Sequence, residues 1–280
     1  MSLEAQRLSS AGPIAFFGSY GSWTHAAARK AFGAHAAFRE NATISQVFEA
    51  VSSGTAEFGV VPIENSTEGG VNQTVDDLLT HRLWIQGEVV LEIAQCLLGL
   101  AADLTTITRV ASHPQGLAQC RRWLAEHLPH AEQVASLSTT SAAHDAASDP
   151  KLAAISSALA GELNGLRVIV DGIQDNAENA TRFVVIAASD AARTGRDKTS
   201  LVFSTAHSRG ALRQALEIFD RAGINLSRIE SRPAPGRRWE YVFLTDLEGH
   251  REDQAIASAL SELESYCSMV RVLGSYPRVT

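Results

Sequence analysis

The chain has 280 residues, of which 45% are hydrophobic and 20% charged, so it is long enough for one large or two ordinary domains with buried cores. Its formal net charge of -7 argues against a nucleic-acid or acidic-membrane partner, because both are themselves negatively charged. The three cysteines, Cys96, Cys120 and Cys267, are too widely spaced to indicate a disulfide framework or a thiolate metal cluster, and a reducing cytoplasmic location is expected. We expect no secretion signal and no membrane-spanning segment.

Four predicted units in the first half of the chain share one construction, in which a short apolar strand or a polar loop leads into a helix. Each loop is rich in small polar residues and leaves free backbone N–H groups at a helix N-terminus, where the helix dipole favours an anion. For any one unit taken singly, a helix N-cap is the better explanation of the polar residues. The units are residues 14–17 with loop 18–22 and helix 25–32, residues 58–61 with loop 62–70 and a helix to 79, loop 111–115 with a helix to 128, and loop 138–141 with helix 142–147.

Strands that alternate with helices predict an α/β domain, whose ligand sites lie beyond the carboxyl ends of the strands. Several loops with hydroxyl and amide groups at such an edge suit a small anionic ligand. A nucleotide is not expected, because no Gly-rich phosphate loop with its lysine is present and the only lysines are Lys30, Lys151 and Lys198.

The stretch 171–183, which ends in Thr181, Arg182 and Phe183, is the most distinctive polar segment. Apolar runs at 166–170 and 183–188 enter and leave it, so two short strands are predicted to flank a polar turn. One interpretation is a hairpin turn with a solvated arginine, and the other is a loop that delivers polar side chains into a cleft. Just before it, residues 153–163 are predicted to form a helix or a strand–helix pair.

A second module is predicted after a polar linker of small residues at 188–197. Its strands and helices follow the order βαββαβ, which indicates a compact ferredoxin-like fold. The predicted elements are strand 199–204, helix 210–222, strand 224–229, strand 241–245, helix 254–264 and strand 270–273.

The chain resembles the prephenate dehydratase family over residues 14–276, through several motifs together. Seven stretches are similar to its catalytic half: 18–27, 59–66, 112–115, 119–120, 138–139, 142–143 and 179–183. Three more are similar to its regulatory ACT domain: 210–212, 223–226 and 230–233. The resemblance implies a two-lobed catalytic domain like a type 2 periplasmic binding protein at 13–190, with the site in the cleft between its lobes, and an ACT domain at 198–280. It also implies a monofunctional, cytoplasmic, cofactor-free enzyme that forms a homodimer or homotetramer.

The family further implies decarboxylative dehydration of prephenate to phenylpyruvate, with feedback regulation by L-phenylalanine. By resemblance, Thr181 assists the departing hydroxyl as a proton or hydrogen-bond donor, and Arg182 contacts a substrate carboxylate or forms an inter-lobe salt bridge. The implied substrate-binding residues are Ser22, Thr24, Asn65, Ser66, Ser112, Gln115, Ser138, Thr139, Thr140 and Phe183. The implied phenylalanine-binding residues are Gly210, Ala211, Leu212, Asn225, Leu226, Glu230, Ser231 and Arg232.

Alternatives to these roles remain open at the level of sequence. Asn65 and Ser66 also suit a turn, the polar residues at 112–115 and 138–140 also suit helix caps, and Phe183 also suits a core position. Departures from the family pattern at Ser19, 23–24 and Asn164 affect the expected substrate preference. The competing functions are arogenate dehydratase, a non-aromatising prephenate decarboxylase and a non-catalytic amino-acid sensor.

Overall fold

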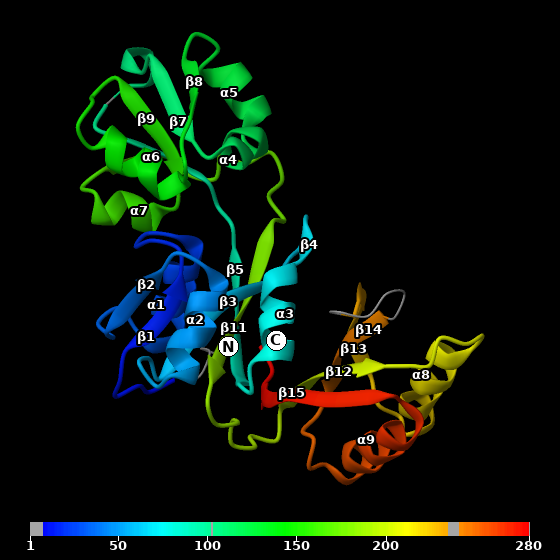
Figure 1. Ribbon diagram of the computed structural model, residues 1–280. Helices are drawn as coiled ribbons and strands as arrows, with labels where there is room; N and C mark the ends of the chain where they lie inside the picture. Colours follow the sequence, from blue (N-terminus) through cyan, green and yellow to red (C-terminus); the bar gives the residue numbers. More distant parts are fainter. Residues whose placement is uncertain (1–7, 102, 235–240, 280) are drawn as a thin grey trace.

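The computed structural model describes residues 8–101, 103–234 and 241–279 and contains three β-sheets, each flanked by helices (Figure 1). Two sheets form two lobes of the N-terminal part, and the third forms a C-terminal module. Within the described residues, no helix is both long enough and apolar enough to cross a membrane.

Lobe I is built on the sheet with strand order β2-β1-β3-β11-β5, to which the short β4 adds by pairing with β3. Strands β1, β2 and β3 are parallel, whereas β11 is antiparallel to both its neighbours. Ser22 caps α1, and Thr43 forms a capping box with Gln46 at the start of α2. The elements are β1 (Ile14–Phe17), α1 (Trp23–Phe32), β2 (Phe38–Asn41), α2 (Ile44–Ser52), β3 (Phe58–Asn65), β4 (Gly69–Gly70), α3 (Asn72–Thr80), β5 (Trp84–Glu92) and β11 (Ala180–Ala187).

Lobe II is built on the sheet with strand order β10-β6-β9-β7-β8. The chain enters it after β5 and returns to lobe I through β11, so two crossings join the lobes (Figure 1). Its elements are β6 (Cys96–Gly99), the 3-10 helix η1 (Leu104–Thr106), β7 (Arg109–Ser112), α4 (Pro114–Gln119), α5 (Arg121–His127), β8 (Glu132–Ala135), α6 (Thr139–Ala146), β9 (Leu152–Ser156), α7 (Ala158–Leu163) and β10 (Arg167–Val170).

Three local predictions for this part of the chain are settled by these elements. Residues 153–163 are a strand–helix pair, β9 and α7. The single helix expected through residue 128 is instead two helices, α4 and α5, that break at Cys120. The hairpin interpretation of 171–183 is wrong, because β10 belongs to the lobe II sheet and β11 to the lobe I sheet. The polar segment between them crosses from one lobe to the other.

The C-terminal module has the predicted order βαββαβ and a four-stranded antiparallel sheet in the order β13-β14-β12-β15. Helices α8 and α9 pack on one face of this sheet, around Phe219 and Leu263. The opposite face packs against lobe I, since Val202, Leu244 and Tyr276 share a buried core with residues of β3 and β5. The elements are β12 (Asp197–Ser204), α8 (Ala211–Arg221), β13 (Leu226–Pro233), β14 (Tyr241–Glu248), α9 (Gln254–Tyr266) and β15 (Met269–Pro277).

Gly274 allows β15 to approach lobe I closely. A Cβ atom at this position would lie 2.2 Å from the backbone oxygen of Ile85 in β5. No side chain fits that gap, so the two strands pack backbone to backbone. The C-terminal module is thereby docked on the sheet that carries Thr181.

Candidate active site

Thr181 lies in β11, directly opposite Asn65 at the end of β3. The sequence predicted a loop at this position, but the residue belongs to a strand, and its side chain is half-buried. The Asn65 amide nitrogen Nδ2 donates to Thr181 Oγ1 at 2.9 Å. It also lies 2.9 Å from Asn179 Oδ1 and 3.2 Å from the carbonyl oxygen of Ala180. A pair of adjacent strands therefore brings the predicted catalytic hydroxyl and a predicted binding residue into contact.

The orientation of the Asn65 amide follows from its own contacts. Its oxygen Oδ1 accepts backbone N–H groups from Thr67 at 2.9 Å and from Glu68 at 3.1 Å. An oxygen must face two N–H donors, so the NH2 group must face Thr181. One end of the Asn65 amide thus holds the turn, which is one of its two predicted roles, and the other end contacts Thr181. Its contact with a substrate carboxylate stays a prediction.

Four contacts between the lobes define what we call the inter-lobe junction. Ser19 Oγ lies 2.6 Å from Thr140 Oγ1, Ser157 Oγ donates to the carbonyl of Gly21 at 2.6 Å, and Arg29 pairs with Glu162 at 3.4 Å. Gln115 Nε2 of lobe II donates to the carboxylate of Glu68 in lobe I. Glu68 belongs to the same turn as Asn65, so this last contact places Gln115 near the Thr181–Asn65 pair.

Gly21 is required at the junction for two reasons. Its φ of +87° is a conformation that side chains rarely adopt, and a Cβ atom would lie 3.0 Å from the Cα of Ala160 in α7. Its N–H donates to Nδ1 of His25 at 3.1 Å. Burial, followed by the charge of Arg29, lowers the pKa of His25 to about 4, so the ring is neutral and its Nδ1 can accept this bond.

Two of the predicted helix-terminal residues, Ser22 and Ser138, are N-caps, as their alternative role proposed. Ser22 Oγ accepts the N–H of His25, and Ser138 Oγ accepts the N–H of Ser141 at the start of α6. Ser112 is fully buried, and its hydroxyl donates to the carbonyl of Ile155. Thr24 is buried in α1, whereas Thr139 is half-buried in the first turn of α6. Ser66 Oγ accepts the N–H of Ala180, which closes the turn against β11.

Arg182 occupies a different environment from the one the sequence suggested. Its guanidinium donates to Glu64 at 2.9 Å, to Glu88 at 3.2 Å and, in the C-terminal module, to Asp246 at 2.8 Å. Burial alone lowers the pKa of Arg182, but the surrounding acidic groups, Asp246 foremost, outweigh burial and raise it. This corrects the expectation that Arg182 contacts a substrate carboxylate or forms an inter-lobe salt bridge, because protein carboxylates already occupy the N–H groups of its guanidinium.

Phe183 also lies away from any solvent-accessible site. Only 1% of its surface is exposed, and it packs in the lobe I core with Phe16 and Val60. Its assignment as a substrate-binding residue is therefore corrected to its alternative, a core position that anchors β11.

Two of the predicted effector residues contact lobe I instead of a ligand pocket. Arg232 pairs with Asp76 of α3 at 3.1 Å, and Glu230 pairs with Arg228 and lies over Gly70 of β4. Asn225 and Ser231 are exposed, and Leu226 packs partly against the module's own core. Within one chain Glu230 and Arg232 are thus held by other protein groups, and their assignment to the effector site stays a prediction.

A separate hollow of about 180 Å³ lies on the helix-bearing face of the module. It is lined by Ser208, Ala211 and Leu212 before and within α8, and by Tyr241 and Phe243 of β14. Gly210, with a φ of +82°, makes the turn into α8 beside it. Two of the predicted effector residues thus line one apolar and hydroxyl-bearing hollow.

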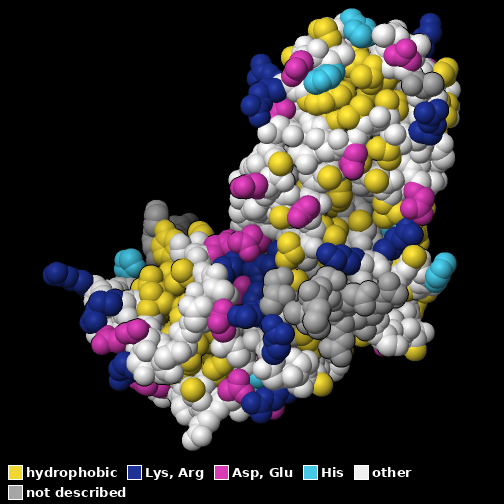
Figure 2. Space-filling model, turned by 180° about the vertical axis from the view of Figure 1, so that it is seen from behind, with side chains coloured by type: hydrophobic (Ala, Val, Ile, Leu, Met, Phe, Trp, Pro, Cys, Tyr) yellow, Lys and Arg dark blue, Asp and Glu magenta, His cyan; other side chains and the backbone are white. Residues whose placement is uncertain are grey.

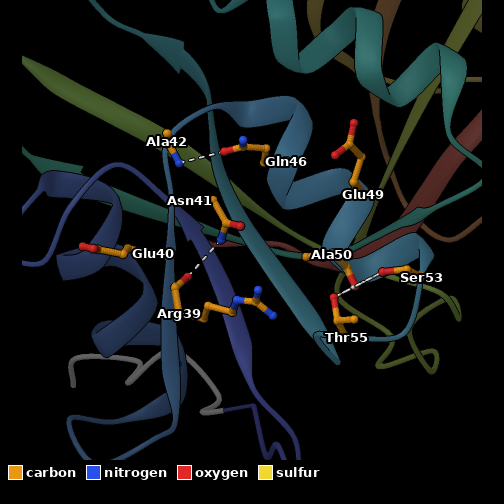
Figure 3. A pocket seen from close by; sticks show the side chains of 9 residues that line it. All are labelled: Arg39, Glu40, Asn41, Ala42, Gln46, Glu49, Ala50, Ser53 and Thr55. Carbon is orange, nitrogen blue, oxygen red and sulfur yellow. Dashed lines mark hydrogen bonds between the residues drawn. The ribbon is translucent and has the colours of Figure 1, made fainter.

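A larger but shallow groove of about 490 Å³ lies in lobe I (Figure 3). Side chains of β2 and α2, among them Arg39, Gln46 and Glu49, surround it. Gln46 and Asn41 are hydrogen-bonded to nearby backbone groups, as the dashed lines show. None of the predicted site residues lies here.

Several residues of the site were missed by the sequence reading. Asn179, Glu68 and Ser19 contact predicted residues directly, while Glu64, Glu88, Asp246 and Lys198 surround Arg182. Asn179 and Ser19 lie in stretches that resemble the family, 179–183 and 18–27, whereas the signal for Glu68 was its proximity in the chain to Asn65 and Ser66. The members of the second group come from four separate strands, and only Glu64 lies in a stretch that resembles the family, 59–66, so no local pattern could place them around Arg182.

Comparisons with known proteins agree with this architecture. The family model described as prephenate dehydratase matches residues 14–191, and the one described as ACT domain matches residues 199–265. A bifunctional chorismate mutase/prephenate dehydratase of Aquifex aeolicus is 42% identical over 265 residues, which cover 95% of this chain and 73% of that protein.

Two solved structures share the whole fold. A prephenate dehydratase from Arthrobacter aurescens, in complex with L-Phe, is 38% identical with a TM-score of 0.85 and covers 95% of this chain and 90% of its own. GqqA, described as a novel type of quorum quenching acylase, is 32% identical with a TM-score of 0.86, and the match covers 95% of this chain and 98% of that one. The two-lobed α/β fold with a ferredoxin-like module is thereby confirmed. This chain belongs to the prephenate dehydratase family and carries a C-terminal ACT domain.

Proposed function

We propose that this chain converts prephenate to phenylpyruvate with Thr181 as the hydroxyl that assists the departing hydroxide. Prephenate carries two carboxylates and a ring hydroxyl, and loss of carbon dioxide and water makes the ring aromatic. Aromatisation supplies the driving force, so the protein has to hold a dianion and help hydroxide leave. One hydrogen-bond donor aimed at the leaving oxygen meets the second need.

The observation that carries the proposal is the hydrogen bond from Asn65 to Thr181. A hydroxyl has one hydrogen and two lone pairs, and the Asn65 N–H occupies one lone pair. The hydrogen of Thr181 is then free to point at a substrate. Donation to the oxygen also favours its partly negative form, which strengthens the hydroxyl as an acid relative to an isolated threonine.

The substrate carboxylates are proposed to bind at the inter-lobe junction. Gln115 and Glu68 meet there, and the N-terminus of α6 lies in the same region through the contact of Thr140 with Ser19. Backbone N–H groups at that helix terminus favour a carboxylate. A substrate carboxylate would replace the Glu68 carboxylate as the acceptor of the hydrogen bond that the Gln115 amide donates.

The test combines product identity with one substitution. Purified protein is incubated with prephenate and, separately, with arogenate, and products are identified by ultraviolet absorbance and mass. Phenylpyruvate from prephenate is expected. Because one fold can host several activities, the identity of the product distinguishes prephenate dehydratase from the competing functions. Thr181→Val is expected to lower kcat by about 10²- to 10⁴-fold, the usual value of a positioned proton transfer.

Three results would overturn the proposal. A non-aromatic keto acid would indicate a decarboxylase, strong preference for arogenate would indicate an arogenate dehydratase, and binding without turnover would indicate a sensor. Near-normal turnover by Thr181→Val would remove Thr181 from the reaction while leaving the activity itself in place.

We further propose that L-phenylalanine inhibits the enzyme by binding in the ACT hollow lined by Ala211, Leu212 and Phe243. The similar protein from Arthrobacter aurescens is described as a complex with L-Phe, which supports this choice of ligand. Addition of L-phenylalanine is expected to lower activity saturably, and Ala211→Leu, which fills the hollow, is expected to weaken that inhibition without changing the uninhibited rate. A flat response of the wild type to L-phenylalanine would contradict the proposal.

Pairing of two ACT domains into a homodimer or homotetramer is also proposed. Strand β13 is an edge strand of its sheet. Ile229 on β13 is 47% exposed, and Tyr241 on β14 is 44% exposed. Unpaired strand edges and exposed apolar side chains favour association. Sedimentation that gives a monomer at micromolar concentration would argue against pairing.

The three free cysteines, two of them buried, support a cytoplasmic location.

A further inference from the structure

Arg182 follows Thr181 in β11, and Glu64 precedes Asn65 in β3. The strand register pairs Thr181 with Asn65 and Arg182 with Glu64, so two consecutive rungs of one ladder hold both pairs. Neighbouring residues of a strand point to opposite faces of the sheet. The Thr181–Asn65 pair therefore has a charged pair behind it, on the face that meets the ACT domain.

The charged pair belongs to a buried network that joins the two domains. Asp246 of the ACT domain contacts Arg182 at 2.8 Å through one oxygen and accepts from Ser200 at 2.6 Å through the other. Lys198 donates to Glu88 at 2.8 Å, and Glu88 in turn accepts from Arg182 at 3.2 Å. Both Glu88 and Asp246 have less than a tenth of their surface exposed. Basic and acidic side chains also gather at the surface where the ACT domain meets lobe I (Figure 2).

The ladder is irregular at this point. After Arg182 pairs with Glu64, Phe183 pairs with Pro62, so Ile63 is an extra residue on β3. Such bulges bend a strand and re-aim its side chains, and their register needs to be held by other contacts. Arg182 Nε and Nη2 both donate to one carboxylate oxygen, Glu64 Oε2, at 3.1 and 2.9 Å, and these charge-assisted bonds hold the two strands together directly beside the bulge.

We propose that Arg182 and Glu64 are positioning residues that fix the Thr181–Asn65 geometry, and that Asp246 makes the ACT domain part of the basal catalytic apparatus. The inference rests on the proposed role of Thr181. The ACT domain carries a carboxylate that keeps the Arg182 fork in place whether or not an effector is bound. Loss of that carboxylate weakens the pairing of Arg182 with Glu64 and moves the Thr181 hydroxyl away from the position that its catalytic role requires.

The test uses Asp246→Asn, which keeps the shape of the side chain and removes its charge. Because a displacement of about 1 Å at a catalytic group can cost about 100-fold, we expect kcat to fall by about 10- to 100-fold. The KM for prephenate is expected to stay within about twofold, since groups that act on the transition state alone leave KM unchanged. Glu64→Gln, at a carboxylate with 38% of its side chain exposed, is expected to behave in the same way and carries less risk of misfolding.

Asp76→Asn is the matched control. It removes a different ion pair across the same domain boundary, between Asp76 and Arg232, without touching β11. We expect it to leave kcat unchanged. Thermal unfolding of all variants, measured in parallel, confirms that each is folded at the assay temperature.

A double-mutant cycle separates positioning from general destabilisation. If Asp246 acts only through Thr181, Asp246→Asn has no further effect on kcat in a Thr181→Val background. An equal fractional loss in both backgrounds, or a wild-type kcat in folded Asp246→Asn and Glu64→Gln, would overturn the inference. Failure of the wild type to form phenylpyruvate would instead overturn the proposed function, so the two failures are distinguishable.

Discussion

Replacement of Asn65 by aspartate tests the direction of one hydrogen bond at nearly constant shape. In the wild type, Nδ2 donates to Thr181 Oγ1 while Oδ1 accepts the N–H groups of Thr67 and Glu68. A carboxylate keeps the second role and loses the first. Its free oxygen becomes an acceptor for the Thr181 hydroxyl, so the proton turns away from the substrate.

The expected loss follows from the contacts. Removal of the positioned proton should lower kcat by about 10²- to 10⁴-fold, or about 3 to 5 kcal/mol of barrier. The new oxygen also faces Asn179 Oδ1 and the carbonyl of Ala180, each of which loses the donor that Asn65 supplied. Repulsion among these oxygens should reduce the free energy of unfolding by about 1 to 3 kcal/mol, which a domain of ordinary stability tolerates.

The assay is the pH dependence of kcat for phenylpyruvate formation by Asn65→Asp, normalised to the wild type at each pH. A protonated carboxyl is again a donor to Thr181, so relative activity should recover as pH falls through the pKa of the introduced group. Asn65→Ala is the control, because it has no donor at any pH and its ratio to the wild type should stay flat. A normal kcat for Asn65→Asp at neutral pH, or the same flat ratio for both variants, would refute the reasoning.

Three further predictions concern packing and titration. Gly274→Ala should separate β15 from β5, because its Cβ would overlap the Ile85 carbonyl. Calorimetry should then show a separate, lower-temperature unfolding transition for the ACT domain. A single unchanged transition would contradict this prediction. Neutral His25 contributes stability that is complete above about pH 6.5 and declines as pH falls toward 4, since its folded pKa is below its unfolded value. His25→Gln should flatten the melting temperature across that window, and an unchanged slope would show that other groups control it. Burial raises the pKa of Cys96 and Cys120 to about 12, so neither should be alkylated by iodoacetamide at pH 8 in the folded protein, as judged by mass spectrometry.

The sequence by itself determined the local elements and the family. Apolar runs and polar caps were sufficient to predict β1, α1, α6 and the βαββαβ order of the ACT domain, because strand and helix periodicity and N-cap chemistry act over a few residues. The importance of the stretch around Thr181 was also visible, since its residue types match one family pattern. These features depend on neighbours in the chain.

The tertiary structure alone decided which way each side chain of that stretch points. Thr181, Arg182 and Phe183 are consecutive, yet they contact Asn65, an ACT carboxylate and the lobe I core respectively. The strand alternates its faces, and a bulge shifts the register of its partner. Asp246 of the ACT domain, 64 residues further along the chain than Arg182, packs behind the strand. The partners of Arg182 come from separate strands, so no local pattern could reveal that its charge is satisfied within the protein. Strand pairing and domain docking are long-range decisions, and they separate the hydroxyl proposed for catalysis from the arginine beside it.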